Sequence, residues 1–195
     1  TDYMDLYYLH FDDGTTPVEE TLSAFDELVK SGKVKEIGVS NISPERLKES
    51  LEFSDKNNLA KYQALQPLYN LVERKGYETN YAPIVAEHGL TVFPYYALAS
   101  GFLTGKYRSE NDFSKSPRGQ GAAKYLNAQG LNILSALDQI ADKHNAVPAS
   151  VALAWLSAQP NVGGSIASAT STEQLTEILS SSSLSLDSAD FELLD

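Results

Sequence analysis

Short apolar segments alternate with amphipathic segments along this sequence, and this alternation is the feature that most restricts its fold. The apolar segments have the length and the β-branched and aromatic content of buried strands. We expect five strands, at 3–9, 34–40, 62–70, 90–98 and 162–168. Helical patterns stand between and after them, at 17–31, 43–58, 80–89, 122–145, 148–159, 171–179 and 188–195.

Capping residues mark several of the expected helix ends. Thr16 and Ser43 are expected N-caps, because each is followed by a proline and then by glutamate in the first turn. Gly32 and Gly89 stand just past the ends of two helices, where glycine is the usual stop signal.

The repeated strand-helix order predicts parallel strands joined by crossover helices, and hence an α/β fold. No GxGxxG or GxxxxGK[ST] stretch follows the first strand, which argues against the doubly wound nucleotide-binding folds and favours a (β/α)8 TIM barrel. A closed barrel takes about 250 residues, whereas five units are predicted here. We therefore expect residues 1–195 to be the C-terminal part of one barrel domain, with strands 4 to 8, completed by an N-terminal segment that the sequence lacks.

Composition narrows the classes of partner. The formal net charge of -11 disfavours nucleic acid and anionic membrane surfaces, which both bind clusters of Lys and Arg. Cysteine is absent, so disulfides, thiolate catalysis and Cys-based metal sites are excluded. We expect a cytoplasmic protein, since no signal peptide or long apolar span is present.

The expected strand ends carry amides, a histidine and aromatic rings. In a barrel these ends gather into one concave site. They lack the paired carboxylates of glycosidases, a metal-ligand set and a GxSxG elbow. Amides and a tyrosine ring suit a planar aromatic amide such as nicotinamide. The residues in question are His10, Ser40, Asn41, Gln66, Tyr95 and Tyr96.

In these residues and their spacing the chain resembles the aldo-keto reductase family. The matching segments occur in one register from residue 1 to 195: DLYYLH, GVSN, the Gln of QPLYN, PYYALASGFLTGKY, VALAWLSAQP and SIASATSTEQL. The resemblance implies a (β/α)8 barrel that binds NAD(P)H along its rim and reduces a small-molecule carbonyl substrate, an aldehyde or a ketone.

The resemblance also implies roles for individual residues. His10 would orient and polarise the substrate carbonyl, Ser40, Asn41 and Gln66 would bind the nicotinamide carboxamide, and Tyr95 would stack on the nicotinamide ring. The pyrophosphate would lie along Tyr96, Ala97, Leu98, Ser100, Gly101, Leu103 and Lys106. The adenosine phosphate, ribose phosphate and adenine would meet Ser168, Ala169, Thr170, Ser171, Gln174 and Glu177.

The chain departs from the family pattern at several positions. The family's tyrosine acid and its lysine and aspartate belong to the first strands, so residues 1–195 alone are expected to be inactive. Phe11 replaces a frequent tryptophan, and Ile178 a common asparagine. Thr170 and Gln174 stand where many members place an arginine against the 2′-phosphate, although NADP(H) remains the expected cofactor over NAD(H).

Three other interpretations stay open. His10 can be a structural residue that closes a strand. The whole chain can be a non-catalytic cofactor-binding subunit, like the family relatives that pair with membrane channels. A phosphate-binding isomerase or aldolase barrel would need a catalytic acid or a Schiff-base lysine at a strand end, and none is visible.

Overall fold

The computed structural model describes residues 1–195, and these divide into two compact units. The first unit consists of Thr1–Pro67 and Lys75–Phe93. The second consists of Leu68–Arg74 and Pro94–Asp195.

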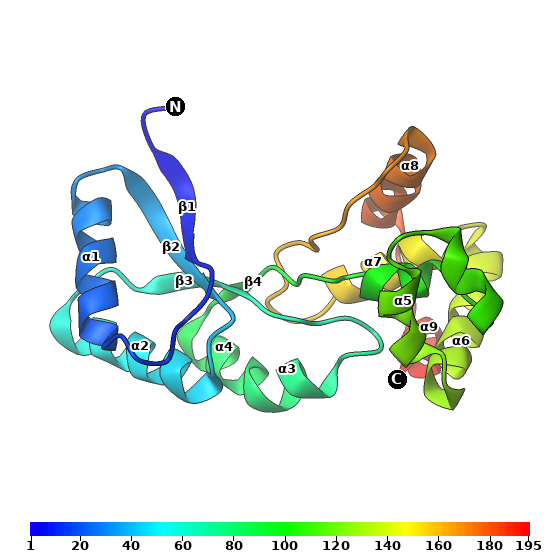
Figure 1. Ribbon diagram of the computed structural model, residues 1–195, viewed down its shortest axis with the longest axis horizontal. Helices are drawn as coiled ribbons and strands as arrows, with labels where there is room; N and C mark the ends of the chain where they lie inside the picture. Colours follow the sequence, from blue (N-terminus) through cyan, green and yellow to red (C-terminus); the bar gives the residue numbers. More distant parts are fainter. The chain divides into compact units, whose positions relative to one another are not determined.

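The first unit is a parallel sheet covered by helices (Figure 1). Its four strands lie in the order β1-β2-β3-β4, and every neighbouring pair is parallel. The strands are β1 (Met4–Leu9), β2 (Val34–Ser40), β3 (Tyr62–Gln66) and β4 (Thr91–Val92). The helices are α1 (Val18–Lys30), α2 (Pro44–Asn57), α3 (Lys75–Asn80) and α4 (Ala82–His88). The predicted α/β class with parallel strands is thereby confirmed.

Helices α1, α2 and α4 line one side of this sheet in Figure 1. Their apolar stripes are buried, with Leu22 on α1 and Leu47 and Leu51 on α2 each 0% exposed. Ile37 and Leu65 of the sheet are equally inaccessible, at 1%. Burial of this apolar surface fixes the register of the strands, and so fixes where each strand ends.

The predicted helix caps are confirmed in one case and wrong in another. The Ser43 side chain accepts a hydrogen bond from the Arg46 N–H at 3.2 Å, so it caps α2 as expected. The Thr16 hydroxyl instead donates to Asp13 at 2.7 Å, and Pro17 takes the N-cap position without a side-chain bond. Thr16 is drawn away from the helix because the Asp13 carboxylate, which also accepts its N–H, is the stronger local partner.

The second unit is helical. It contains α5 (Gly119–Ala122), α6 (Ala128–His144), α7 (Pro148–Ser157), α8 (Thr172–Ser180) and α9 (Ser188–Leu194). Short 3₁₀ turns are η1 (Ala99–Thr104), η2 (Glu110–Lys115), η3 (Ala123–Tyr125) and η4 (Ser181–Ser183). Helix α7 is central, since α6 and α8 both pack against it and its Trp155 is 0% exposed. None of the helices is long and apolar enough to cross a membrane.

Three predicted strands differ from the structure. β3 ends at Gln66 and β4 at Val92, so the expected strands 62–70 and 90–98 are both too long. The fifth predicted strand, 162–168, does not form, although the Ile166 N–H donates to the Pro94 carbonyl at 2.9 Å. Gly163 and Gly164 weaken extended structure there, because glycine has no side chain to pack and loses much entropy when ordered.

One helical prediction also needs correction, and one helix was not predicted. The expected helix 122–145 is interrupted, because the Asn127 side chain accepts a hydrogen bond from the Gly130 N–H at 3.0 Å and starts α6 anew. Helix α3 was not predicted, since its sequence KGYETN has no apolar period and Tyr77 is its one buried residue.

Candidate functional site

Polar groups converge where the strands of the first unit end. The Ser40 hydroxyl, which is fully buried, donates to the Gln66 carbonyl at 2.8 Å. The Asn41 amide donates to the His10 carbonyl at 2.8 Å and to the Ser40 hydroxyl at 3.2 Å. The parallel register therefore brings together His10, Ser40, Asn41 and Gln66, four residues that the sequence predicted for one site.

The side chains of this group differ in accessibility. His10 is exposed, and its ring meets the edge of Phe11 with centroids 4.6 Å apart. Gln66 is half-buried, and its side-chain amide makes no hydrogen bond within the chain. A partly buried amide of this kind needs an outside partner, either water or a bound ligand. Asn41 adopts the left-handed conformation with φ 47°, which asparagine tolerates better than most residues.

The loop that follows His10 is held by an ion pair. Arg46 of α2 grips both carboxylate oxygens of Asp12, with Nε–Oδ2 at 3.1 Å and Nη2–Oδ1 at 2.9 Å. The same Nη2 donates to the Thr16 carbonyl at 2.8 Å, and the Asp12 N–H donates to the Asn41 carbonyl at 3.2 Å. A bidentate pair with little solvent exposure restricts the loop more than a surface ion pair would.

In the second unit, the segment after β4 has unusual backbone geometry. Tyr96, Ala99, Ser100 and Gly101 all have positive φ, at 53°, 50°, 57° and 88°. The turn is closed by the Ala99 N–H donating to the Tyr96 carbonyl at 2.7 Å and the Gly101 N–H donating to the Leu98 carbonyl at 2.8 Å. Successive left-handed residues make a concave backbone of the kind that binds anions in other proteins.

Lys106 lies against this turn. A Cβ built on Gly101 would lie 3.3 Å from both Cε and Nζ of Lys106, so the ammonium group approaches the glycine closely. Lys106 forms no ion pair within the chain, unlike Arg108, whose Nη2 bonds the Asp138 carboxylate at 2.7 Å. A half-buried cation without a carboxylate partner, in a chain of net charge -11, fits an anionic ligand.

Tyr95 precedes the turn. Its ring meets the Tyr96 ring edge to face with centroids 5.4 Å apart. Burial raises the pKa of Tyr95, and the neighbouring Tyr96 and Glu73 add to that effect. Its hydroxyl therefore stays neutral at physiological pH.

The residues predicted to meet the adenosine end cluster at the start of α8. The Ser171 side chain caps the helix by accepting from the Gln174 N–H at 3.3 Å. The Gln174 side chain accepts from the N–H and hydroxyl of Thr170, at 3.0 and 3.1 Å. The Glu177 side chain is exposed. Gln174 thus has a structural role in the cap, which the sequence prediction did not include.

Arg118 is a cation that the sequence prediction missed. It precedes α5, and its Nη1 lies 3.4 Å from the Ser168 hydroxyl. Helix α5 also contacts the turn at Ser100, since a Cβ built on Gly121 would lie 3.2 Å from the Ser100 Oγ. No local signal singles out this arginine, because its neighbour Ser168 is 50 positions away in the sequence.

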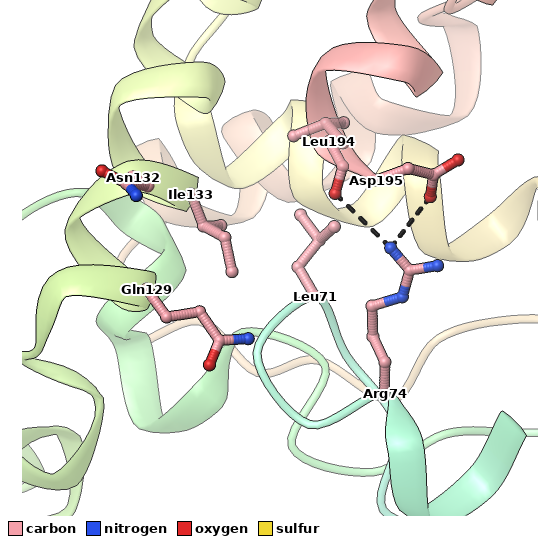
Figure 2. A pocket seen from close by; sticks show the side chains of 7 residues that line it. All are labelled: Leu71, Arg74, Gln129, Asn132, Ile133, Leu194 and Asp195. Atoms are coloured by element: carbon pink, nitrogen blue, oxygen red, sulfur yellow. Dashed lines mark hydrogen bonds and ion pairs between the residues drawn. The ribbon is translucent and has the colours of Figure 1, made fainter. Parts of the chain in front are cut away.

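A separate hollow of about 380 Å³ lies among α6, α9 and the segment before α3 (Figure 2). Figure 2 shows Arg74 reaching to the Leu194 carbonyl and the Asp195 carboxylate, at 3.4 and 2.9 Å. Its guanidinium also lies over the Trp155 ring, 5.0 Å from the centroid. The hollow is lined by Leu71, Arg74, Gln129, Asn132, Ile133, Leu194 and Asp195, none of which was predicted for the site. No group of His, Asp or Glu side chains is arranged to hold a metal ion.

Comparison with known protein families shows to which family the chain is related. A model of the Aldo/keto reductase family matches residues 1–195. The chain belongs to this family. The predicted resemblance is thereby confirmed.

The individual relatives are identical to this chain at about one residue in three. A probable voltage-gated potassium channel subunit beta of Arabidopsis thaliana is 33% identical over 181 residues, covering 90% of this chain and 55% of that protein. An L-glyceraldehyde 3-phosphate reductase of Escherichia coli O157:H7 is 31% identical over 182 residues, covering 90% and 52%. A Schizosaccharomyces pombe protein named aldo-keto reductase yakc [NADP(+)] is 32% identical over 164 residues, covering 81% and 46%. The chain spans about half the length of these family members.

Proposed function

We propose that the complete protein containing these residues reduces aldehydes or ketones to alcohols with NADP(H). Residues 1–195 would supply the C-terminal part of a (β/α)8 barrel, and the family match supports the barrel fold. The observation that carries the proposal is the convergence of His10, Ser40, Asn41 and Gln66 at the ends of adjacent parallel strands. Polar groups at such ends are typical of barrel active sites.

His10 would orient the substrate carbonyl. Its exposed ring is free to donate a hydrogen bond to a carbonyl oxygen, while its backbone is held by Asn41. A donor fixed in this way stabilises the negative charge that develops on the oxygen during reduction. The protonating acid would be a tyrosine outside residues 1–195, and the nicotinamide cofactor would supply the hydride.

Each of the two units carries groups whose chemistry suits a part of a dinucleotide. The unpaired Gln66 amide suits the carboxamide of nicotinamide, and the neutral, half-buried Tyr95 ring suits its flat face. Lys106 and the left-handed turn at Ala99–Thr104 would bind the pyrophosphate. The N-terminus of α8 with Arg118 beside Ser168 would meet the adenosine phosphate. The name of the Schizosaccharomyces pombe relative supports NADP(H) as the cofactor.

Titration of the complete protein with NADPH, followed by turnover of a panel of aldehydes and ketones, tests the proposal. His10→Gln should leave NADPH binding unchanged and lower kcat by roughly 100-fold, the usual loss when one donor to a developing oxyanion is removed. His88→Gln, at the C-terminal end of α4, is the matched control and should retain activity. A complete protein that does not bind NADPH would refute the proposal.

A second candidate function is a cofactor-binding subunit without catalysis. The relative in Arabidopsis thaliana is named a probable potassium channel subunit beta, and it matches 90% of this chain. The cofactor residues would then act in binding alone, and His10 would be structural. Tight NADPH binding without turnover of any carbonyl compound in the panel would favour this function over reduction.

A further inference from the structure

A buried asparagine connects two segments of the second unit. Asn70 is 0% exposed, and its side-chain amide donates to the Tyr96 carbonyl at 3.0 Å. Its side-chain oxygen accepts from the N–H groups of Val72 and Glu73, at 3.0 and 2.9 Å. Two residues earlier, Leu68 pairs with Tyr95 in a parallel bridge. Asn70 thus extends the pairing of these segments through its side chain.

The residue whose carbonyl Asn70 binds, Tyr96, has a strained backbone. Tyr96 has φ 53°, a conformation that costs a bulky residue energy. Its carbonyl oxygen accepts two hydrogen bonds, from Asn70 and from the Ala99 N–H at 2.7 Å. Together these bonds keep the Tyr96 peptide in the orientation that begins the left-handed turn. Tyr95 directly precedes Tyr96 in the chain and is paired with Leu68, so the backbone that carries the Tyr95 ring is held at Tyr95 by this bridge and at Tyr96 by the bonds to its carbonyl.

Asn70 is itself anchored. Glu73, whose N–H binds the Asn70 oxygen, accepts from Lys124 Nζ at 2.7 Å and from the Tyr125 hydroxyl at 3.1 Å. The hydrogen bond to Glu73 holds the pKa of Lys124 well above its ordinary value. The turn at Asn70 is therefore held at Glu73, which is anchored by Lys124 and Tyr125. The Asn70 side chain, held in this way, can fix the position of the Tyr96 carbonyl.

Asparagine suits this place because of its hydrogen-bonding groups. One flat amide accepts from two N–H groups at one end and donates to a carbonyl at the other. Aspartate accepts in the same geometry but, when ionised, has no donor for the Tyr96 carbonyl.

We infer that Asn70 is a positioning residue of the cofactor site: it holds the Tyr96 carbonyl and thereby aims the Tyr95 ring at the cofactor. This inference rests on the proposed function. It goes beyond it by assigning the geometry of the stacking ring to a residue that does not contact the ligand.

The test is Asn70→Asp in the complete protein, with NADPH as the probe. The carboxylate keeps both backbone N–H partners but removes one of the two donors to the Tyr96 carbonyl and leaves the Ala99 N–H as the other. The dissociation constant for NADPH, measured by fluorescence titration, should rise roughly tenfold, because the new carboxylate would face the Tyr96 carbonyl oxygen where the amide of Asn70 donated a hydrogen bond to it. The KM for the carbonyl substrate at saturating NADPH should not change. A merely structural role would lower the fraction of active protein and leave both constants as in the wild type.

Asn132→Asp is the matched control, since it adds the same charge at an exposed position on α6. Wild-type protein that binds no NADPH would refute the proposed function. Wild-type protein that binds NADPH while Asn70→Asp binds it equally well, or Asn132→Asp weakens binding as much, would overturn the inference alone.

If Asn70→Asp does not fold, Lys124→Met replaces it, because this exposed side chain anchors Glu73. Its dissociation constant should rise by roughly twofold to fivefold, in keeping with the loss of one partly exposed ion pair. An unchanged constant would then overturn the inference.

Discussion

Replacing Asp190 with asparagine should lower the free energy of unfolding at pH 7 and remove the share of its acid dependence below pH 5 that comes from this carboxylate. Asp190 lies on α9 with its side chain 3% exposed, and its carboxylate accepts from Lys143 at 2.8 Å and from His144 at 2.7 Å. The Asp187 N–H donates to it at 3.0 Å, which completes a capping box. These bonds join α9 to the end of α6.

The size of the effect on the free energy of unfolding follows from the shifted pKa of the Asp190 carboxyl group. Burial raises the pKa of Asp190, but the hydrogen bonds from Lys143, Asp187 and His144 lower it more, from 3.8 to about 2. This difference corresponds to roughly 2.5 kcal/mol of stability at neutral pH. Because the folded-state pKa lies below the unfolded one, the stabilisation is present above about pH 4 and is lost as the pH falls toward 2.

Urea unfolding of the complete protein, followed by far-UV circular dichroism between pH 7 and pH 2, is the measurement. Asp190→Asn should be about 2–3 kcal/mol less stable than the wild type at pH 7, with the difference shrinking toward zero near pH 2. Asp142→Asn, at an exposed position on α6, should stay within about 0.5 kcal/mol of the wild type. A difference between Asp190→Asn and the wild type that stays constant with pH would refute the reasoning.

Three further substitutions test the first unit by unfolding of the complete protein. Gly38→Ala should lower the free energy of unfolding by about 1–3 kcal/mol, because the new Cβ would lie 2.6 Å from a ring carbon of Tyr8. Adding Tyr8→Leu should recover part of this loss. Additive effects of the two substitutions would contradict the packing argument. Ser43→Ala should lower the free energy of unfolding by about 1 kcal/mol, because the cap of α2 is lost. An unchanged urea midpoint would show that the cap is dispensable. A double-mutant cycle with Asp12→Asn and Arg46→Met should give a coupling free energy of about 1–2 kcal/mol, and this coupling should persist at high salt. A coupling that salt abolishes would indicate an ordinary surface ion pair.

The parts of the fold that the sequence predicted well depend on neighbouring residues. β2 has the predicted bounds, Val34–Ser40, and α2 lies within the predicted range 43–58 with Ser43 as its cap. Their signals, an apolar run and a Ser-Pro-Glu start, act over a few residues. The short α3 and the interruption at Asn127 were missed because weak periodicity and an internal cap do not stand out in an alanine-rich stretch.

The candidate site was predictable where residues end strands. His10, Ser40, Asn41 and Gln66 were chosen because they follow or close apolar runs, and the parallel register brings them together. The cofactor roles of these residues remain predictions. Arg118 and Asn70 were not predicted for the site, because the groups that they contact come from distant parts of the chain.

By itself, the sequence determined the α/β class, the parallel strands, the start of α2 at Ser43 and the family, because these depend on local patterns and on motifs read in order. The tertiary structure alone decided which side chains meet. The bond from Asn70 to the Tyr96 carbonyl joins residues 26 positions apart, and that from Arg118 to Ser168 joins residues 50 apart. Such contacts form only when packing of the buried apolar surface fixes the backbone, so the sequence pattern cannot display them.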